Sequence, residues 1–124
     1  MNKSVLLVDD DKVLNYLTRK SFKNSGLVDQ IEVAVNGQEA LDILVNTQQI
    51  PDFILLDIGM PIMDGFQFLD AYTKLNLKKR SKIAIYTSSI EEADKAKASE
   101  YSDVIDFIVK PLTEKKLREI VAAI

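Results

Sequence analysis

The sequence predicts an α/β fold: a doubly wound parallel sheet of five strands, each followed by a helix, or (βα)5. Short apolar runs rich in valine and isoleucine alternate with longer amphipathic stretches, which is the pattern of strands and crossover helices. The first and third runs are apolar at every position, as expected of strands covered by helices on both faces. The predicted strands are residues 5–8, 31–35, 53–56, 83–86 and 104–109.

The first predicted helix covers residues 12–23 and follows the first strand. Its expected inner face consists of Val13, Leu14, Leu17 and Phe22. Asp11 precedes this amphipathic run, so we expect it to cap the helix rather than to bind a metal. Gly26 is the expected C-terminal stop, because glycine adopts the left-handed conformation that often ends a helix.

Each later helix is expected to begin at a residue whose side chain accepts hydrogen bonds from free backbone N–H groups. These expected caps are Asn36, Asp64, Ser89 and Thr113. Glu92 follows Ser89 by three residues, which is the spacing of a capping box. The helix after Ser89 offers mainly alanine to the core and is the least apolar of the predicted helices, so its stability depends most on its surroundings.

The length, the residue types that are absent and the net charge exclude several classes of protein. The 124 residues fit one domain, residues 1–124, without a separate effector domain. Cysteine and histidine are absent, which excludes disulfides, thiol and Ser-His-Asp catalysis, and histidine-ligated zinc. The net charge of −3 argues against direct nucleic-acid binding. The apolar run at residues 5–8 is too short for a signal peptide or a membrane span, so we expect a cytoplasmic location without membrane association.

Polar residues follow four of the predicted strands. Ligand sites of open α/β sheets lie beyond the carboxyl ends of the strands, where the strand order reverses. The residues expected there are Asp9, Asp10, Asp57, Thr87 and Lys110. Two carboxylates about 4 Å apart repel each other by roughly 4 kcal/mol at an effective dielectric constant of about 20. This acidic cluster must therefore take up protons or a hard cation, and its oxygen ligands suit Mg²⁺.

These residues, in this order, resemble the receiver domain of bacterial response regulators over essentially the whole chain. The motifs are Asp9-Asp10, Leu55-Leu56-Asp57-Ile58-Gly59-Met60-Pro61, Thr87 and Lys110-Pro111. The resemblance implies two-component signalling by a single-domain, chemotaxis-type receiver. It also implies a flavodoxin-like strand order of 2-1-3-4-5.

The resemblance further implies a metal site and a phosphorylation site. Asp10 and Asp57 would bind Mg²⁺ directly, Asp9 through water, and Gly59 through its backbone carbonyl. Asp57 would accept a phosphoryl group from a histidine kinase or a histidine phosphotransfer protein. Lys110 would supply a positive charge and Thr87 a hydroxyl, so the module would catalyse its own phosphorylation and dephosphorylation without being an enzyme. The family's bond at Lys110-Pro111 is commonly cis.

Signalling would follow from the same resemblance. Thr87 would turn toward the phosphoryl group, and Phe107 would be the aromatic switch residue, although the family more often has tyrosine there. The output surface would be the fourth helix, the fifth strand and the fifth helix. It would bind a separate downstream protein, and a phosphorylation-dependent homodimer is a second use of that surface.

Simpler interpretations remain open at this stage. Asp9 and Asp10 by themselves suit a solvated strand end, Lys110 suits a surface position, and Phe107 suits core packing. An aspartyl phosphatase of the haloacid dehalogenase type is an alternative function, but that class typically has Asp-x-Asp, and here Asp57 is followed by Ile58 and Gly59. A receiver fold acting as a scaffold without phosphorylation, and a flavin-binding protein, are further alternatives.

Overall fold

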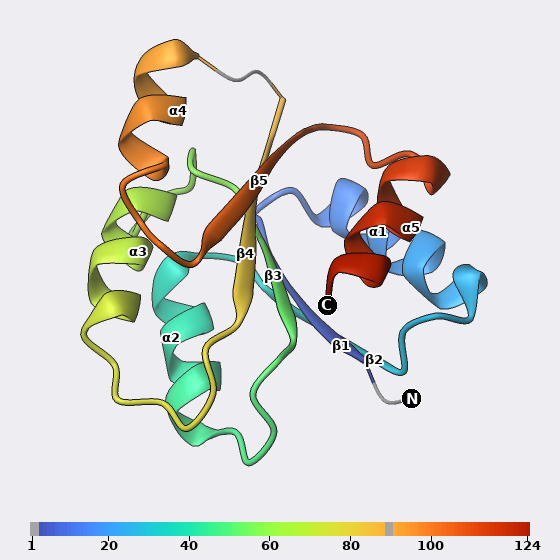
Figure 1. The fold of residues 1–124 in the computed structure, drawn as a ribbon, viewed down its shortest axis with the longest axis horizontal. Helices are drawn as coiled ribbons and strands as arrows, with labels where there is room; N and C mark the ends of the chain where they lie inside the picture. The colour runs from blue at the N-terminus through green and yellow to red at the C-terminus, as the bar shows by residue number, and fades with distance from the viewer. Residues whose placement is uncertain (1–2, 89–90) are drawn as a thin grey trace.

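The computed structural model describes residues 3–88 and 91–124, in which strands and helices alternate along the chain (Figure 1). The strands form one parallel sheet in the order β2-β1-β3-β4-β5, which confirms the predicted fold and strand order. The elements are β1 (Ser4–Val8), α1 (Lys12–Ser25), β2 (Gln30–Ala34), α2 (Gly37–Asn46), β3 (Phe53–Leu56), α3 (Gly65–Thr73), β4 (Lys82–Thr87), α4 (Glu92–Ala98), β5 (Val104–Val109) and α5 (Glu114–Ala123). Because β1 lies between β2 and β3, the strand order reverses at β1.

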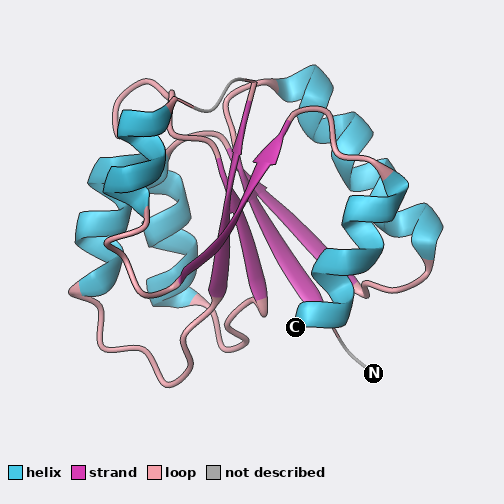
Figure 2. Cartoon of the chain, turned by 45° about the horizontal axis from the view of Figure 1, so that its top comes forward, coloured by secondary structure: helices cyan, strands magenta, loops and turns pink. Residues whose placement is uncertain are grey.

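The sheet is a middle layer between two layers of helices. Helices α2, α3 and α4 cover one face, and α1 and α5 cover the other (Figures 1 and 2). In β1, Leu6 and Val8 pack in the first of the resulting cores, and Val5 and Leu7 pack in the second. This two-sided burial explains why β1 is apolar throughout. Among the described residues, no helix has the length and apolarity needed to span a membrane.

The helix ends confirm most of the predicted caps. The side chains of Asp11, Asn36, Asp64 and Thr113 each accept a hydrogen bond from a backbone N–H in the first turn of the helix that follows. Gly26 ends α1 in the left-handed conformation, with a φ of 70°. The predicted cap at Ser89 lies outside the described residues. Helix α4 begins at Glu92 after Glu91, which makes no side-chain capping hydrogen bond.

The predicted inner face of α1 is wrong in part. Val13 and Leu17 are 72% and 52% exposed, whereas Asn15, Thr18 and Phe22 are buried. Spacings of three and four residues place these buried side chains on one face of the helix. Two of them are polar and are stabilised by hydrogen bonds to other elements, which the hydrophobic pattern of the helix alone does not reveal.

Candidate functional site

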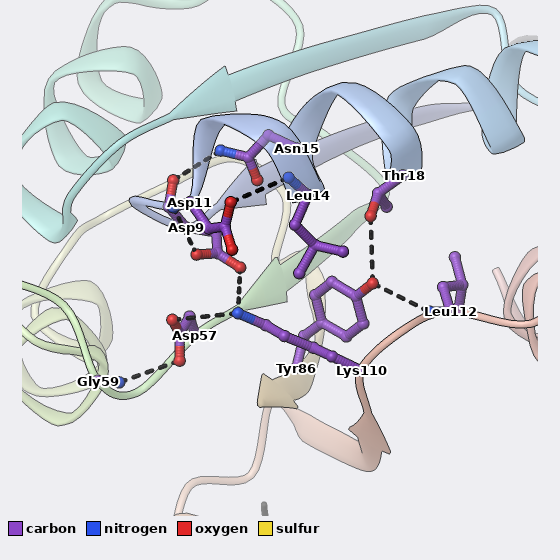
Figure 3. A network of polar contacts seen from close by, with 10 residues as sticks. All are labelled: Asp9, Asp11, Leu14, Asn15, Thr18, Asp57, Gly59, Tyr86, Lys110 and Leu112. Atoms are coloured by element: carbon purple, nitrogen blue, oxygen red, sulfur yellow. Dashed lines mark hydrogen bonds and ion pairs between the residues drawn. The ribbon is translucent and has the colours of Figure 1, made fainter. Parts of the chain in front are cut away.

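The carboxyl ends of four strands converge at one edge of the sheet. Asp9 directly follows β1, Asp57 follows β3, Thr87 ends β4, and Lys110 follows β5. Backbone hydrogen bonds extend the sheet to these residues: the Asp57 amide donates to the Val8 carbonyl at 2.9 Å, and the Lys110 amide donates to the Thr87 carbonyl at 2.8 Å. Figure 3 shows the side chains of Asp9, Asp57 and Lys110 pointing toward one another.

Asp9 is an acidic side chain in a buried position, with 2% of its surface exposed. The Asp11 amide donates to its Oδ1 at 3.0 Å, and the Asn15 side-chain amide donates to its backbone carbonyl at 2.7 Å. Burial raises the pKa of Asp9 above its ordinary value, and the hydrogen bonds from Lys110 and the Asp11 amide offset this only in part. Burial therefore disfavours the charged form of the Asp9 carboxyl group at this site.

Lys110 bridges the two buried carboxylates. Its Nζ lies 2.5 Å from Oδ2 of Asp9 and 3.3 Å from Oδ2 of Asp57. Burial alone lowers the pKa of Lys110, but Asp9 and Asp57 together raise it above its ordinary value. Lys110 is therefore a charged residue within the site, and the alternative of a simple surface lysine is excluded.

Asp57 is held on its other side by the loop that follows β3. The Gly59 amide donates to Oδ1 of Asp57 at 3.1 Å. The carboxylate is buried, with Lys110 on one oxygen and the Gly59 amide on the other (Figure 3). Both contacts fix the direction of the carboxylate, which suits a nucleophile or a metal ligand.

The donor set fits a divalent cation. Carboxylate oxygens of Asp9, Asp10 and Asp57 lie within 4.8 Å of one another, and Asp10 is exposed to solvent. Lys110 compensates one of three negative charges, so a divalent cation balances the remaining two. Among the described residues, Asp9 Oδ2 has no hydrogen-bond partner apart from its ion pair with Lys110. Oxygen-only ligands with one side open to water suit Mg²⁺, which keeps several of its waters in proteins.

The predicted switch residues lie beside this site. Thr87 is buried at the end of β4 and pairs with Val109 of β5. Phe107, on β5, packs against the core beneath α2, α3 and α4, and Nζ of Lys95 on α4 lies 5.7 Å from its ring centroid. Phe107 therefore contacts both the core and α4, which is compatible with packing and with switching.

A second set of polar residues next to the site was missed by the sequence analysis. Asn15 and Thr18 of α1 reach the site from the helix, and the hydroxyl of Tyr86 on β4 contacts Thr18 (Figure 3). Asn15 and Thr18 lie three residues apart on α1, a spacing that places both on one face. The spacing alone does not show that this face is buried, so it could not have identified them. Tyr86 was hidden because it stands in an otherwise apolar strand.

The strand order and the two-layer covering define a doubly wound α/β protein of the flavodoxin-like class. A family model described as response regulator receiver domain matches residues 5–122. The chain therefore belongs to the response regulator receiver domains, the signalling modules of two-component systems, which work with histidine kinases or phosphotransfer proteins.

Individual relatives agree with this assignment. The chain is 31% identical over 121 residues to sporulation initiation phosphotransferase F of Bacillus subtilis, covering 98% of this chain and 92% of that protein. It is 35% identical over 117 residues to sensor histidine kinase CheAY of Helicobacter pylori, covering 94% of this chain but 14% of that longer protein. The crystal structure of a two component response regulator from Cytophaga hutchinsonii is similar, with a TM-score of 0.84, 29% identity and 98% coverage of both chains.

Proposed function

We propose that the protein accepts a phosphoryl group on Asp57 from a phosphohistidine of a histidine kinase or a histidine phosphotransfer protein. The observation that carries this proposal is the bridging position of Lys110, whose ammonium contacts both Asp9 and Asp57 at the edge where the strand order reverses. A carboxylate next to a fixed positive charge is arranged to attack phosphorus and to have its product stabilised.

Mg²⁺ is the proposed cofactor. The carboxylates of Asp9, Asp10 and Asp57 would hold it, with the backbone carbonyl of Gly59 as a further ligand. When bound, the ion neutralises the charge that develops on phosphoryl oxygens. The protein itself supplies the orientation of these groups: the Asp11 and Gly59 amides each fix one carboxylate oxygen.

The transfer follows from the positions of the side chains. An oxygen of Asp57 forms the new bond to phosphorus as the bond from phosphorus to the imidazole nitrogen breaks, and the leaving imidazole takes a proton from solvent. Lys110 Nζ lies 3.3 Å from Oδ2 of Asp57, so it reaches the oxygens of a group attached there. The Thr87 hydroxyl is the proposed second donor. Water would later hydrolyse the acyl phosphate in the same site, which regenerates the Asp57 carboxylate and releases inorganic phosphate. The proposed domain is therefore a switch that catalyses its own phosphorylation and dephosphorylation.

The proposed output surface is formed by α4, β5 and α5. A phosphoryl group brings nearly two negative charges and three hydrogen-bond acceptors to Thr87. Movement of Thr87 toward it would change the space beneath α4, where Phe107 and Lys95 meet. Phe107 has no hydroxyl, so burial of its ring, rather than a hydrogen bond to a partner, would carry the change. The surface would bind a separate downstream protein, and a homodimer formed only after phosphorylation is the alternative use.

The proposal is tested by intact-mass spectrometry after incubation with phosphoramidate. The wild-type protein is expected to gain one phosphoryl group with Mg²⁺ and none with a chelator. Asp57→Ala is expected to gain none under either condition. A gain that persists in Asp57→Ala, or no gain in the wild type under any condition, would contradict the proposed function.

A further inference from the structure

Tyr86 joins three segments next to the site. It lies in β4, one residue before Thr87, and is 2% exposed. Its hydroxyl accepts a hydrogen bond from the Leu112 amide at 3.0 Å and shares one with the Thr18 hydroxyl of α1 at 3.1 Å (Figure 3). A phenylalanine would fill the same space in the core, so core packing does not account for the hydroxyl and its two hydrogen bonds.

The segment that Tyr86 holds is the one that carries Lys110. The Lys110 amide donates a backbone hydrogen bond to the carbonyl of Thr87, the end residue of β4, and the chain then runs toward α5. Leu112 is two residues farther on, so its bond to Tyr86 sets the path of the chain just beyond the sheet. The ring of Tyr86 also lies against the lysine itself, with Nζ of Lys110 5.5 Å from the ring centroid.

A lysine at this position needs such support. Its side chain has a flexible four-carbon stem, and its ammonium is a compact point charge without the rigid fork of arginine. To contact Asp9 and Asp57 together, the stem must start from a fixed backbone and follow one path. Tyr86 acts at both ends of that path: its hydroxyl holds the backbone and its ring contacts the ammonium.

We propose that Tyr86 is a positioning residue for Lys110, which anchors Leu112 through its hydroxyl and keeps the ammonium between Asp9 and Asp57. The Thr18 hydroxyl is the second partner of the Tyr86 hydroxyl, but it belongs to α1 and not to the segment that carries Lys110. Tyr86 acts through Lys110, without touching the transferred group. The predicted effect on phosphorylation rests on the proposed function, whereas the predicted position of Lys110 does not.

The first test is the rate of phosphorylation of Tyr86→Phe by phosphoramidate at a fixed Mg²⁺ concentration. This variant keeps the ring and removes only the hydroxyl. The rate is expected to fall about three- to tenfold, the scale of one lost hydrogen bond. Thr18→Val is the matched control: it also leaves a buried hydroxyl without its partner but retains the bond to Leu112. Its rate is expected to stay within about twofold of the wild-type rate.

A double-mutant cycle separates positioning from a general structural effect. If Tyr86 acts through Lys110, Tyr86→Phe is expected to cause no further loss in the Lys110→Ala background. The same fold-loss in both backgrounds would show that Tyr86 acts independently of the lysine and would overturn the proposal. A wild-type rate in Tyr86→Phe would overturn it as well.

A second readout uses NMR on the unphosphorylated protein. In Tyr86→Phe the Leu112 amide is expected to exchange with solvent faster, and the ε-methylene signals of Lys110 are expected to shift. In Thr18→Val both are expected to stay close to the wild-type values. Unchanged Lys110 signals in Tyr86→Phe would overturn the positioning role. Failure of the wild type to take up a phosphoryl group would instead contradict the proposed function alone.

Discussion

Each end of the sheet has an aspartate paired with a lysine, but the pKa of the aspartate is shifted in opposite directions at the two ends. At the end where the strands begin, Asp52 accepts a hydrogen bond from the Ser4 amide at 2.9 Å and pairs with Lys79. Burial alone raises the pKa of Asp52, but these partners lower it below its ordinary value. At the other end, burial outweighs the partners of Asp9 and its pKa is raised. Both carboxylates have a lysine partner, so the balance of burial and hydrogen bonds decides the difference.

The surroundings of Asp52 show what a cluster built for stability looks like. Arg80 pairs with Asp103 at 2.9 Å, donates to the Leu75 carbonyl and lies 4.2 Å from the ring centroid of Tyr72. The Ser81 amide donates to the Tyr72 hydroxyl at 2.8 Å. The carboxylates of Asp52 and Asp103 at this end therefore each have a basic side chain as an ion-pair partner. At the carboxyl end Lys110 contacts two of the three clustered carboxylates, those of Asp9 and Asp57, and the remaining excess of negative charge is what a cation can relieve.

Removal of the proposed nucleophile is expected to have the largest effect. Asp57→Asn keeps the size of the side chain but loses the charge that attacks phosphorus. The rate of phosphorylation by phosphoramidate is expected to fall more than about 10³-fold, the scale seen when a nucleophile is removed. Asp52→Asn, the matched change at the other end, is expected to retain the wild-type rate. Equal losses in both variants would remove the distinction between the two ends.

The next largest effect is expected from the lysine at the site. Lys110→Ala is expected to slow phosphorylation by about 10²-fold, because it removes a fixed charge from the position where negative charge develops. Lys79→Ala tests the lysine at the other end, whose side chain is 51% exposed. That variant is expected to leave the rate unchanged. Stopped reactions analysed by intact mass give both rates, and a large loss in Lys79→Ala would count against this account.

A smaller effect is expected on stability from Asp9→Asn. The folded-state pKa of Asp9 is raised, so its contribution to stability is fully present only below its unfolded pKa and is lost as pH rises through the folded value. At pH 7, above the ordinary pKa of 3.8, burial of this carboxyl group therefore lowers the stability of the fold, and Asn removes that penalty. The melting temperature is expected to rise by a few degrees at pH 7 without Mg²⁺. A lower melting temperature would show that its ion pair with Lys110 outweighs desolvation.

The smallest effect has the opposite sign. The folded-state pKa of Asp52 is lowered, so its contribution is present above its unfolded pKa and is lost as pH falls through the folded value. Asp52→Asn is expected to reduce the free energy of unfolding by about 1 kcal/mol at pH 7. The difference from the wild type is expected to disappear when urea unfolding is measured well below the ordinary pKa of 3.8. A difference that is independent of pH would point to packing rather than charge.

The sequence predicted the sheet and its edge well because both depend on local signals. The all-apolar run at residues 53–56 is a strand buried on both faces, and the polar residues that follow the strands meet at one edge. The inner face of α1 was mispredicted because its buried polar residues, Asn15 and Thr18, are stabilised by hydrogen bonds to partners outside that helix, the Asp9 carbonyl and the Tyr86 hydroxyl. Tyr86 was missed for the same reason, since its partners come from α1 and from the loop before α5.

The most direct test of the central claim is an Mg²⁺ titration followed by thermal unfolding. The claim is that the cluster of Asp9, Asp10 and Asp57 is arranged for a cation, whereas Asp52 is already satisfied. Mg²⁺ at ten times its dissociation constant is expected to stabilise the wild type and Asp52→Asn equally, by about 1.4 kcal/mol, and Asp57→Asn much less. Equal stabilisation of Asp57→Asn, or none of the wild type, would contradict the claim.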